Sequence, residues 1–185
     1  MLASASPRRA ELLQAAGFEF EVISAHVDET PRVGESAEAY TSRVAGDKAR
    51  SVAASIDNAG AVVLGADTEV VVDGRILGKP RGDEHAAHML RLLSGRSHDV
   101  LTALVICGNG RELSDIVRTC VHFAPMSDDE IAQYIRSGEP MGKAGAYAIQ
   151  GYAARFIDRI EGSWSNVVGL PIHTVHRLLR DLQAG

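Results

Sequence analysis

Hydrophobic residues along the chain follow helical spacing in some segments and strand-like spacing in others. Intervals of three and four residues, with helix start and stop signals, predict helices over 7–17, 36–55, 83–95, 127–138 and from about 171 to the C-terminus. Short apolar runs or alternation predict strands over 18–23, 61–66, 69–72, 75–77, 97–107, 112–123 and 153–157. Asp73-Gly74 and Gly108-Asn-Gly110 are turn signals between such runs. Because hairpins recur, the pattern predicts a mixed α/β fold rather than an all-parallel sheet.

The first helix has clear end signals and an unusual charge. Ser6 is a favoured N-cap residue, Pro7 suits the first helical position, and Gly17 suits the C-terminal cap. Arg8 and Arg9 therefore lie in the first turn, where the helix dipole favours carboxylates instead. A phosphate or other anion bound at this helix end explains two arginines there, and solvated surface arginines are the alternative.

Composition narrows the class of protein. The chain has 185 residues, 45% of them hydrophobic and 23% charged, which is typical of one globular domain spanning 1–185. Its net charge is −5 and no basic cluster lies beyond Arg8-Arg9, so we expect no nucleic-acid partner, although a local pocket for a small anion fits. No apolar run approaches the roughly 20 residues of a membrane helix, and no signal-peptide core precedes Pro7. A cytoplasmic protein without a membrane partner is therefore expected.

Several common catalytic and metal-binding patterns are absent from the sequence. Cys107 and Cys120 have no Cys or His neighbour at zinc-ligand spacing, and reduced thiols are expected. The sequence contains no GxxxxGK[ST] phosphate-binding loop and no G-x-S-x-G turn for a nucleophilic serine. It therefore predicts neither a P-loop ATPase or kinase nor a serine hydrolase.

Short blocks spread along the chain carry a family resemblance. These blocks are Ser6-Pro-Arg-Arg9, Asp28-Glu-Thr30, Lys48, Gly65-Ala-Asp-Thr68, Gly78-Lys-Pro80, Lys143-Ala-Gly-Ala-Tyr-Ala-Ile-Gln-Gly151 and Val168-Gly-Leu-Pro171. In this order they resemble the motifs of the Maf family of nucleoside triphosphate pyrophosphatases, over essentially the whole chain. The resemblance implies an elongated mixed sheet flanked by helices, with two lobes around a cleft, as in Ham1-type (ITPase-like) folds. It also implies hydrolysis to a nucleoside monophosphate and pyrophosphate, assisted by Mg2+ or Mn2+.

The resemblance assigns chemistry to individual acidic residues. Asp67, expected at the end of the buried strand 61–66 and at the sheet's edge, is the implied general base, and a turn-capping Asp is the alternative. Glu29 and Asp67 are the implied metal ligands. Asp28 matches a more variable family position, and Glu69 is the substitute if Glu29 does not serve.

Basic and polar residues complete the implied site. The resemblance assigns phosphate binding to Ser4, Ser6, Arg8, Arg9, Lys48 and Lys79. It assigns substrate specificity to Arg9, Thr68 and Gln150, the combination of family members that act on dTTP and UTP. A Gln amide offers a donor and an acceptor to a uracil or thymine edge, and an amide flip would also accommodate cytosine. Alternative functions are a preference for 7-methyl-GTP or CTP, or a nucleotide-binding regulator of cell division; a homodimer is left open.

Overall fold

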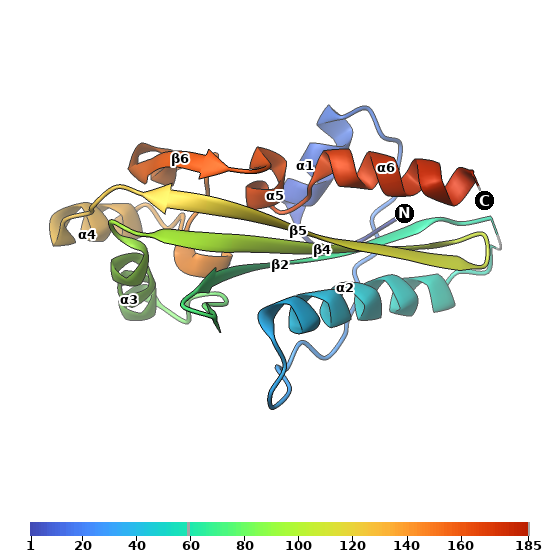
Figure 1. Cartoon of the computed structure of the whole chain (residues 1–185), viewed down its shortest axis with the longest axis horizontal. Helices are drawn as coiled ribbons and strands as arrows, with labels where there is room; N and C mark the ends of the chain where they lie inside the picture. The colour runs from blue at the N-terminus through green and yellow to red at the C-terminus, as the bar shows by residue number, and fades with distance from the viewer. Residues whose placement is uncertain (59, 185) are drawn as a thin grey trace. The chain divides into compact units, whose positions relative to one another are not determined.

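Six strands and their flanking helices make up the described part of the chain (Figure 1). The structure is a computed structural model that describes residues 1–58 and 60–184. In chain order its elements are β1 (Leu2–Ala3), α1 (Pro7–Ala15), α2 (Ala37–Ala54), β2 (Val63–Val72), β3 (Arg75–Ile76), α3 (Asp83–Leu93), β4 (Ser97–Gly108), β5 (Arg111–Phe123), α4 (Asp128–Arg136), the 3-10 helices η1 (Ala144–Ala146) and η2 (Tyr152–Phe156), β6 (Ile157–Glu161), α5 (Trp164–Val168) and α6 (Ile172–Gln183). The strand order is β1-β2-β4-β5-β6, with β3 paired to β2. Because β1 pairs parallel to β2 whereas β3 and β6 pair antiparallel, the predicted mixed α/β sheet is confirmed.

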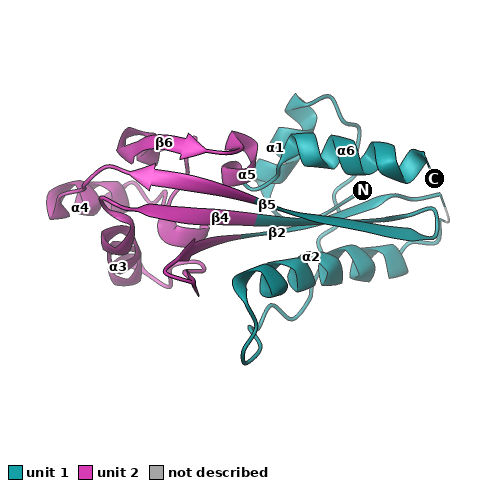
Figure 2. Cartoon of the chain, in the orientation of Figure 1, with its two compact units in different colours: residues 1–68, 102–117, 169–185 teal, residues 69–101, 118–168 magenta. Residues whose placement is uncertain are grey.

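The chain divides into two compact units (Figure 2). The first comprises residues 1–68, 102–117 and 169–185, and the second comprises residues 69–101 and 118–168. Strands β2, β4 and β5 contribute residues to both units. The N-terminal segment and the C-terminal helix α6 therefore belong to the same unit, although they lie at opposite ends of the sequence.

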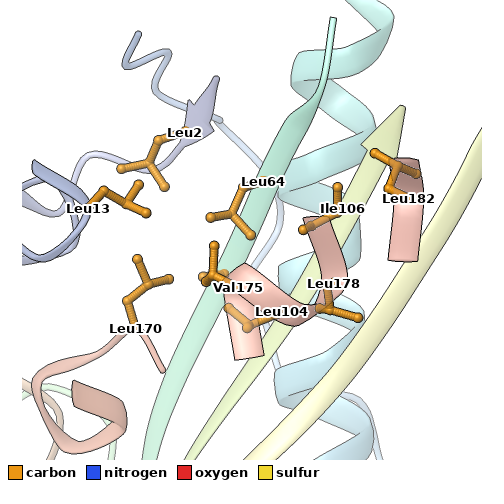
Figure 3. Close-up of a cluster of buried hydrophobic side chains, with 10 residues drawn as sticks. Leu2, Leu13, Leu64, Leu104, Ile106, Leu170, Val175, Leu178 and Leu182 are labelled. Carbon is orange, nitrogen blue, oxygen red and sulfur yellow. The ribbon is translucent and has the colours of Figure 1, made fainter. Parts of the chain in front are cut away.

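In the first unit, helices cover both faces of the strands (Figure 2). On one face, Leu13 of α1 and Leu178 of α6 pack with Leu64 of β2 and Leu104 of β4 (Figure 3). On the other face, the small residues Ala45 and Ala49 of α2 pack against β4. Alternate strand residues point to opposite faces, so each strand supplies both cores.

Gly65 of β2 packs directly against the backbone of α2. A Cβ atom at this position would be 2.3 Å from the carbonyl oxygen of Ala45 and 2.7 Å from the backbone nitrogen of Ala49. Both contacts are with helix backbone, which cannot move aside as a flexible side chain could. The glycine therefore allows the close approach of α2, which also carries Lys48.

We expect Gly65→Ala to lower the free energy of unfolding by about 3 kcal/mol, because the added methyl group overpacks a helix–strand contact made by backbone atoms. Urea-induced unfolding followed by circular dichroism measures this change. Gly60→Ala is the matched control, since its nearest neighbour would be Asn58 Oδ1 at 3.5 Å. Equal stability of the two variants would contradict the predicted close packing.

The second unit is held by aromatic side chains. Tyr134 of α4 stacks on Tyr152 of η2, with ring centroids 5.5 Å apart. His98, Phe123 and Tyr147 form a second cluster of edge-on contacts. Burial, and to a lesser extent His122, lowers the pKa of His98 to about 4, so this ring is neutral near pH 7.

The local helix signals in the sequence are largely confirmed. Ser36 caps α2 by accepting a hydrogen bond from the Ala39 N–H, and Ser127 and Glu130 form the predicted capping box of α4. Gly17 has φ +78° just after α1, and its N–H donates to the Gln14 carbonyl. Ser6 occupies the N-cap position of α1, but its side chain makes no capping bond.

Both predicted hairpin turns are confirmed. Asp73 and Gly74 have φ values of +50° and +73°, and Asn109 and Gly110 have +52° and +70°. These signs match the two-residue turns whose twist suits adjacent antiparallel strands. The second turn joins β4 to β5, whose bounds lie within one residue of those predicted.

Four strand predictions, over 18–23, 61–66, 69–72 and 153–157, differ from the structure. Residues 18–23 form one isolated bridge, Leu2 to Val22, because β1 is only two residues long. Residues 61–66 and 69–72 are not separate strands, since β2 runs unbroken from Val63 to Val72. Residues 152–156 form η2 and the strand begins at Ile157, because the Glu139 carboxylate accepts the first two N–H groups of η2.

Two further expectations concern the thiols and the membrane. Cys107 and Cys120 are both free cysteines. Across residues 1–58 and 60–184, no helix combines the length and the apolarity that crossing a membrane requires.

Candidate active site

Lys48 brings two of the predicted acidic residues together in the first unit. Its Nζ lies 2.8 Å from Asp67 Oδ1 and 2.8 Å from Glu29 Oε1. Asp67 is only 6% exposed, and its second oxygen, Oδ2, is buried without a hydrogen-bond partner among the described residues. A buried carboxylate oxygen in this state is costly unless a ligand, water or cation occupies it. The cluster therefore has an acceptor atom that the protein itself leaves unused.

Helix α2 fixes the loop that carries Glu29. Tyr40 Oη donates to the Glu29 carbonyl at 2.9 Å, and Arg43 Nη2 donates to the Thr30 carbonyl at 3.1 Å. Arg43 also forms a two-point ion pair with Glu35, at 2.7 and 2.9 Å. A hydrogen bond from Arg43 lowers the pKa of Glu35 to about 2, so this pair persists over the whole neutral range. Since Lys48 lies on the same helix, α2 positions both partners of its ion pair with Glu29.

The two alternative acidic residues have other surroundings. Asp28 Oδ1 accepts the Thr30 N–H at 2.9 Å, and hydrogen bonds from the Thr30 side chain and then from this N–H lower the pKa of Asp28. Glu69 is buried and belongs to the second unit. Glu29 is thus the acidic loop residue that contacts Lys48.

Arg9 is buried in a dense set of hydrogen bonds and is only 8% exposed. Its Nη1 donates to Ser4 Oγ at 3.0 Å and to the Ala66 carbonyl at 2.8 Å. Its Nη2 donates to Thr68 Oγ1 at 3.0 Å, and its Nε donates to the Gly169 carbonyl at 2.9 Å. Two of the three expected specificity residues, Arg9 and Thr68, therefore contact each other directly.

The end of β1 explains why Arg9 lies there. The β1 pairing with β2 ends at Ala3 and Gly65, so the next carbonyl on that edge, Ala66, has no strand partner on this side. The Arg9 guanidinium supplies the missing donor. Asp67 follows within the unbroken β2, so its expected position at a strand end is wrong. The gap beside β2 arises because the neighbouring strand stops there.

The start of α1 carries the second arginine. Arg8 makes no hydrogen bond or ion pair with any residue among 1–58 and 60–184, and burial lowers its pKa, an effect that Glu11 partly offsets. Because the Ser6 side chain does not cap the helix, the Arg8 N–H also lacks a capping partner. Ser4 Oγ accepts the Ser6 N–H at 3.2 Å and shapes this segment. The helix end therefore offers donors and positive charge to an anion.

The remaining expected residues, Lys79 and Gln150, belong to the second unit, and both are exposed. Lys79 follows β3, and Gln150 lies in the segment between η1 and η2. Tyr40, Arg43 and Glu35 were not among the predicted site residues. The sequence signal for the ion pair was Glu35, just before the Ser36 cap, and Arg43, eight positions further on in the helix.

The donor set fits a hard divalent cation. Carboxylate oxygens are the ligands that Mg2+ and Mn2+ prefer, and Mg2+ commonly uses one or two of them together with water and phosphate oxygens. In the part of the chain that the structure describes, no group of three or more His, Cys, Asp or Glu side chains could hold a metal ion. Two carboxylates, one of them with an unused buried oxygen, suit a cation whose other ligands are water and phosphate oxygens better than a cation held by protein ligands alone.

Comparisons with known proteins identify the family. The sequence profile described as Maf-like protein matches residues 1–182. A protein of Koribacter versatilis named dTTP/UTP pyrophosphatase is 51% identical over 180 residues, covering 97% of this chain and 92% of the relative. Proteins with the same name from Myxococcus xanthus and Photorhabdus laumondii subsp. laumondii are 50% and 49% identical, covering 97% and 96% of this chain and 90% and 91% of those relatives. With this match along nearly its whole length, the chain belongs to the Maf family.

Proposed function

We propose that this chain is a nucleoside triphosphate pyrophosphatase that hydrolyses dTTP and UTP to the monophosphate and pyrophosphate. The observation that carries the proposal is the buried, unused Oδ2 of Asp67 beside the ion pairs of Lys48. The names of the relatives support the choice of substrates. The proposal takes 1–185 as one catalytic domain.

Asp67 acts as the general base in this proposal. Its Oδ1 accepts from Lys48, which leaves Oδ2 to accept a proton from the attacking water. Water then attacks the α-phosphorus, and pyrophosphate leaves with the electron pair of the broken P–O bond. No covalent nucleophile is required, because an activated water and charge stabilisation suffice for this displacement.

The cationic residues bind the triphosphate. Arg8 is attracted by Glu11 but makes no hydrogen bond with the described residues, and its position at the α1 N-terminus suits phosphate oxygens. Lys48 uses two of its three donors on Asp67 and Glu29, and the third has no partner in the described chain. Ser4, Ser6, Arg9 and Lys79 complete the proposed phosphate-binding set.

Glu29 and Asp67 are the proposed ligands of a divalent cation, Mg2+ or Mn2+. Such a cation, when bound, polarises phosphate oxygens and lowers the pKa of a bound water. The protein contributes the Asp67 carboxylate from β2 and the Glu29 carboxylate from a loop whose backbone Tyr40 and Arg43 hold.

Gln150 is the proposed reader of the pyrimidine base. Its amide provides one donor and one acceptor, which complement the imide edge of uracil or thymine. Arg9 and Thr68, the other two specificity positions, bond to each other and to the Gly169 carbonyl. They are proposed to shape the site together as one hydrogen-bonded unit.

Pyrophosphate release from dTTP, UTP, CTP, GTP, ATP and 7-methyl-GTP, measured with Mg2+ and with Mn2+, tests the proposal. We expect kcat/KM for dTTP and UTP to exceed that for the other nucleotides by at least about tenfold, since mispaired polar groups in a recognition site discriminate strongly. Chelation of the metal should abolish turnover. Preference for 7-methyl-GTP or CTP would refute the specificity, and nucleotide binding without any release would favour a regulator.

A further inference from the structure

Gln150 lies in a tight turn of the second unit. The Gly151 N–H donates to the Ala148 carbonyl at 3.1 Å, which closes a four-residue turn with Gln150 at its third position. The Gln150 side chain is exposed, so the backbone of this turn is what places it. The residues that hold the turn therefore fix the point from which the Gln150 amide reaches out.

One pair of side chains, Tyr134 and Glu139, holds the turn on both sides. At the first residue of the turn, the Ala148 N–H donates to Tyr134 Oη at 3.3 Å. After it, the Tyr152 N–H donates to Glu139 Oε2 at 2.9 Å and the Ala153 N–H donates to Glu139 Oε1 at 3.4 Å. The two anchors are themselves joined, because Tyr134 Oη donates to Glu139 Oε1 at 2.7 Å.

The surroundings make this anchor rigid. Tyr134 is fully buried, and burial, followed by the hydrogen bond to Glu139, raises its pKa, so the hydroxyl remains a donor at neutral pH. A Cβ atom at position 151 would lie 2.1 Å from Glu139 Oε2, so only glycine lets the turn approach the carboxylate this closely. Tyr147, the residue just before the turn, is also buried, and its hydroxyl bonds to His98 Nε2 at 2.8 Å.

Holding the turn matters for base choice because a glutamine amide is ambiguous. Uracil and thymine present an acceptor and an N–H donor at the edge where cytosine presents a donor and an acceptor. A freely rotating amide can satisfy either edge, whereas an amide held in one orientation satisfies only one of them. Support of the turn limits the side-chain conformations from which the Gln150 amide can reach a base, and so favours one pairing over the other.

We propose that Glu139 and Tyr134 are positioning residues that set the preference for uracil and thymine over cytosine by fixing the turn that carries Gln150. This inference rests on the proposed function, in which Gln150 reads the base. Neither residue touches the substrate in this proposal. Both act through the backbone N–H groups of Ala148, Tyr152 and Ala153.

The test compares kcat/KM for UTP and CTP in wild-type protein, Tyr134→Phe, Glu139→Gln and Gln150→Ala. Tyr134→Phe keeps the ring that stacks on Tyr152 and removes only the hydroxyl. We expect it to lower the UTP/CTP ratio about fivefold, the effect of losing roughly one net hydrogen bond of positioning. Adding Tyr134→Phe to Gln150→Ala should lower the ratio no further, because the anchor acts only through Gln150.

Ser94→Ala is the matched control in the same unit. The Ser94 hydroxyl accepts the Met126 N–H at 2.7 Å, so its loss also removes a side chain–backbone bond but leaves residues 147–153 alone. Amide hydrogen exchange at Ala148, Tyr152 and Ala153 should accelerate in Tyr134→Phe and Glu139→Gln and stay unchanged in Ser94→Ala. If Glu139→Gln does not fold, the isosteric Tyr134→Phe still decides the question.

The outcomes separate this inference from the proposed function. A wild-type protein without preference for UTP over CTP contradicts the proposed function and, with it, the inference. If the wild-type preference exists and Gln150→Ala reduces it, but Tyr134→Phe and Glu139→Gln retain it, only the inference is overturned. A further fall in the ratio on adding Tyr134→Phe to Gln150→Ala would also overturn it, since Tyr134 would then act by another route.

Discussion

Asp67→Asn is expected to lower kcat for UTP by about 10³-fold, within the range typical of losing a general base. The amide retains an oxygen that can accept a hydrogen bond from Lys48 Nζ, which lies 2.8 Å from Oδ1 in the wild type, although the ion pair itself is lost. Its nitrogen cannot accept the proton of the attacking water in place of Oδ2. Single-turnover and steady-state pyrophosphate release measure the effect on chemistry and on turnover separately.

Binding must be measured in the same variant. Isothermal titration calorimetry with a non-hydrolysable UTP analogue, without added divalent metal, should give a Kd within about threefold of the wild type, because the phosphate-binding cations are retained. Asp57→Asn is the matched control: it removes one exposed carboxylate that makes no hydrogen bond or ion pair with the described residues. Retention of a tenth or more of wild-type kcat by Asp67→Asn would rule out Asp67 as the base.

Arg9→Lys is expected to lower the free energy of unfolding by about 3 kcal/mol. One ammonium group cannot reproduce the planar fork that reaches Ser4, Thr68 and the carbonyls of Ala66 and Gly169. At least two buried acceptors would lose their donor, at a cost of about 1–3 kcal/mol each. Urea-induced unfolding, followed by circular dichroism and by fluorescence of Trp164, measures the loss.

The neighbouring arginine provides the control for the same chemical change. Arg8 makes no hydrogen bond or ion pair with the described residues, so Arg8→Lys should alter stability by less than about 0.5 kcal/mol. Its effect should instead appear as a raised KM for the nucleotide. If the two variants lose equal stability, the buried hydrogen bonds of Arg9 do not stabilise the fold in the way we infer.

The contrast between Arg8 and Arg9 shows where sequence reasoning stops. Both follow Pro7 in the first turn of α1, and both were expected to bind phosphate. The structure buries Arg9 beside the part of β2 that extends beyond the end of β1. The guanidinium of Arg8, in contrast, makes no hydrogen bond with the described residues. That difference depends on the length of β1, which two apolar residues at the start of the chain do not reveal.

The candidate site was predictable in part. The resemblance identified Asp67, Lys48 and Glu29, and the structure brings these three together in the first unit. Periodicity alone could not, because they lie on a strand, a helix and a loop separated by 19 and 38 residues in sequence. The anchors Arg43 and Glu139 were not predicted, because an ordinary charged residue within a helix, or just after one, carries no local signal of a long-range contact.

By itself the sequence determined the helix ends, the two-residue hairpin turns, the mixed α/β class and the Maf family resemblance. These follow from interactions among residues a few positions apart, such as the Ser127–Glu130 capping box, or from motifs readable in order. Only the tertiary structure decided that β2 continues through Asp67, that Arg9 bonds to Thr68, and that Glu139 holds the turn of Gln150. Those contacts join segments distant in the chain, and they form only where packing brings a buried donor next to an unsatisfied acceptor.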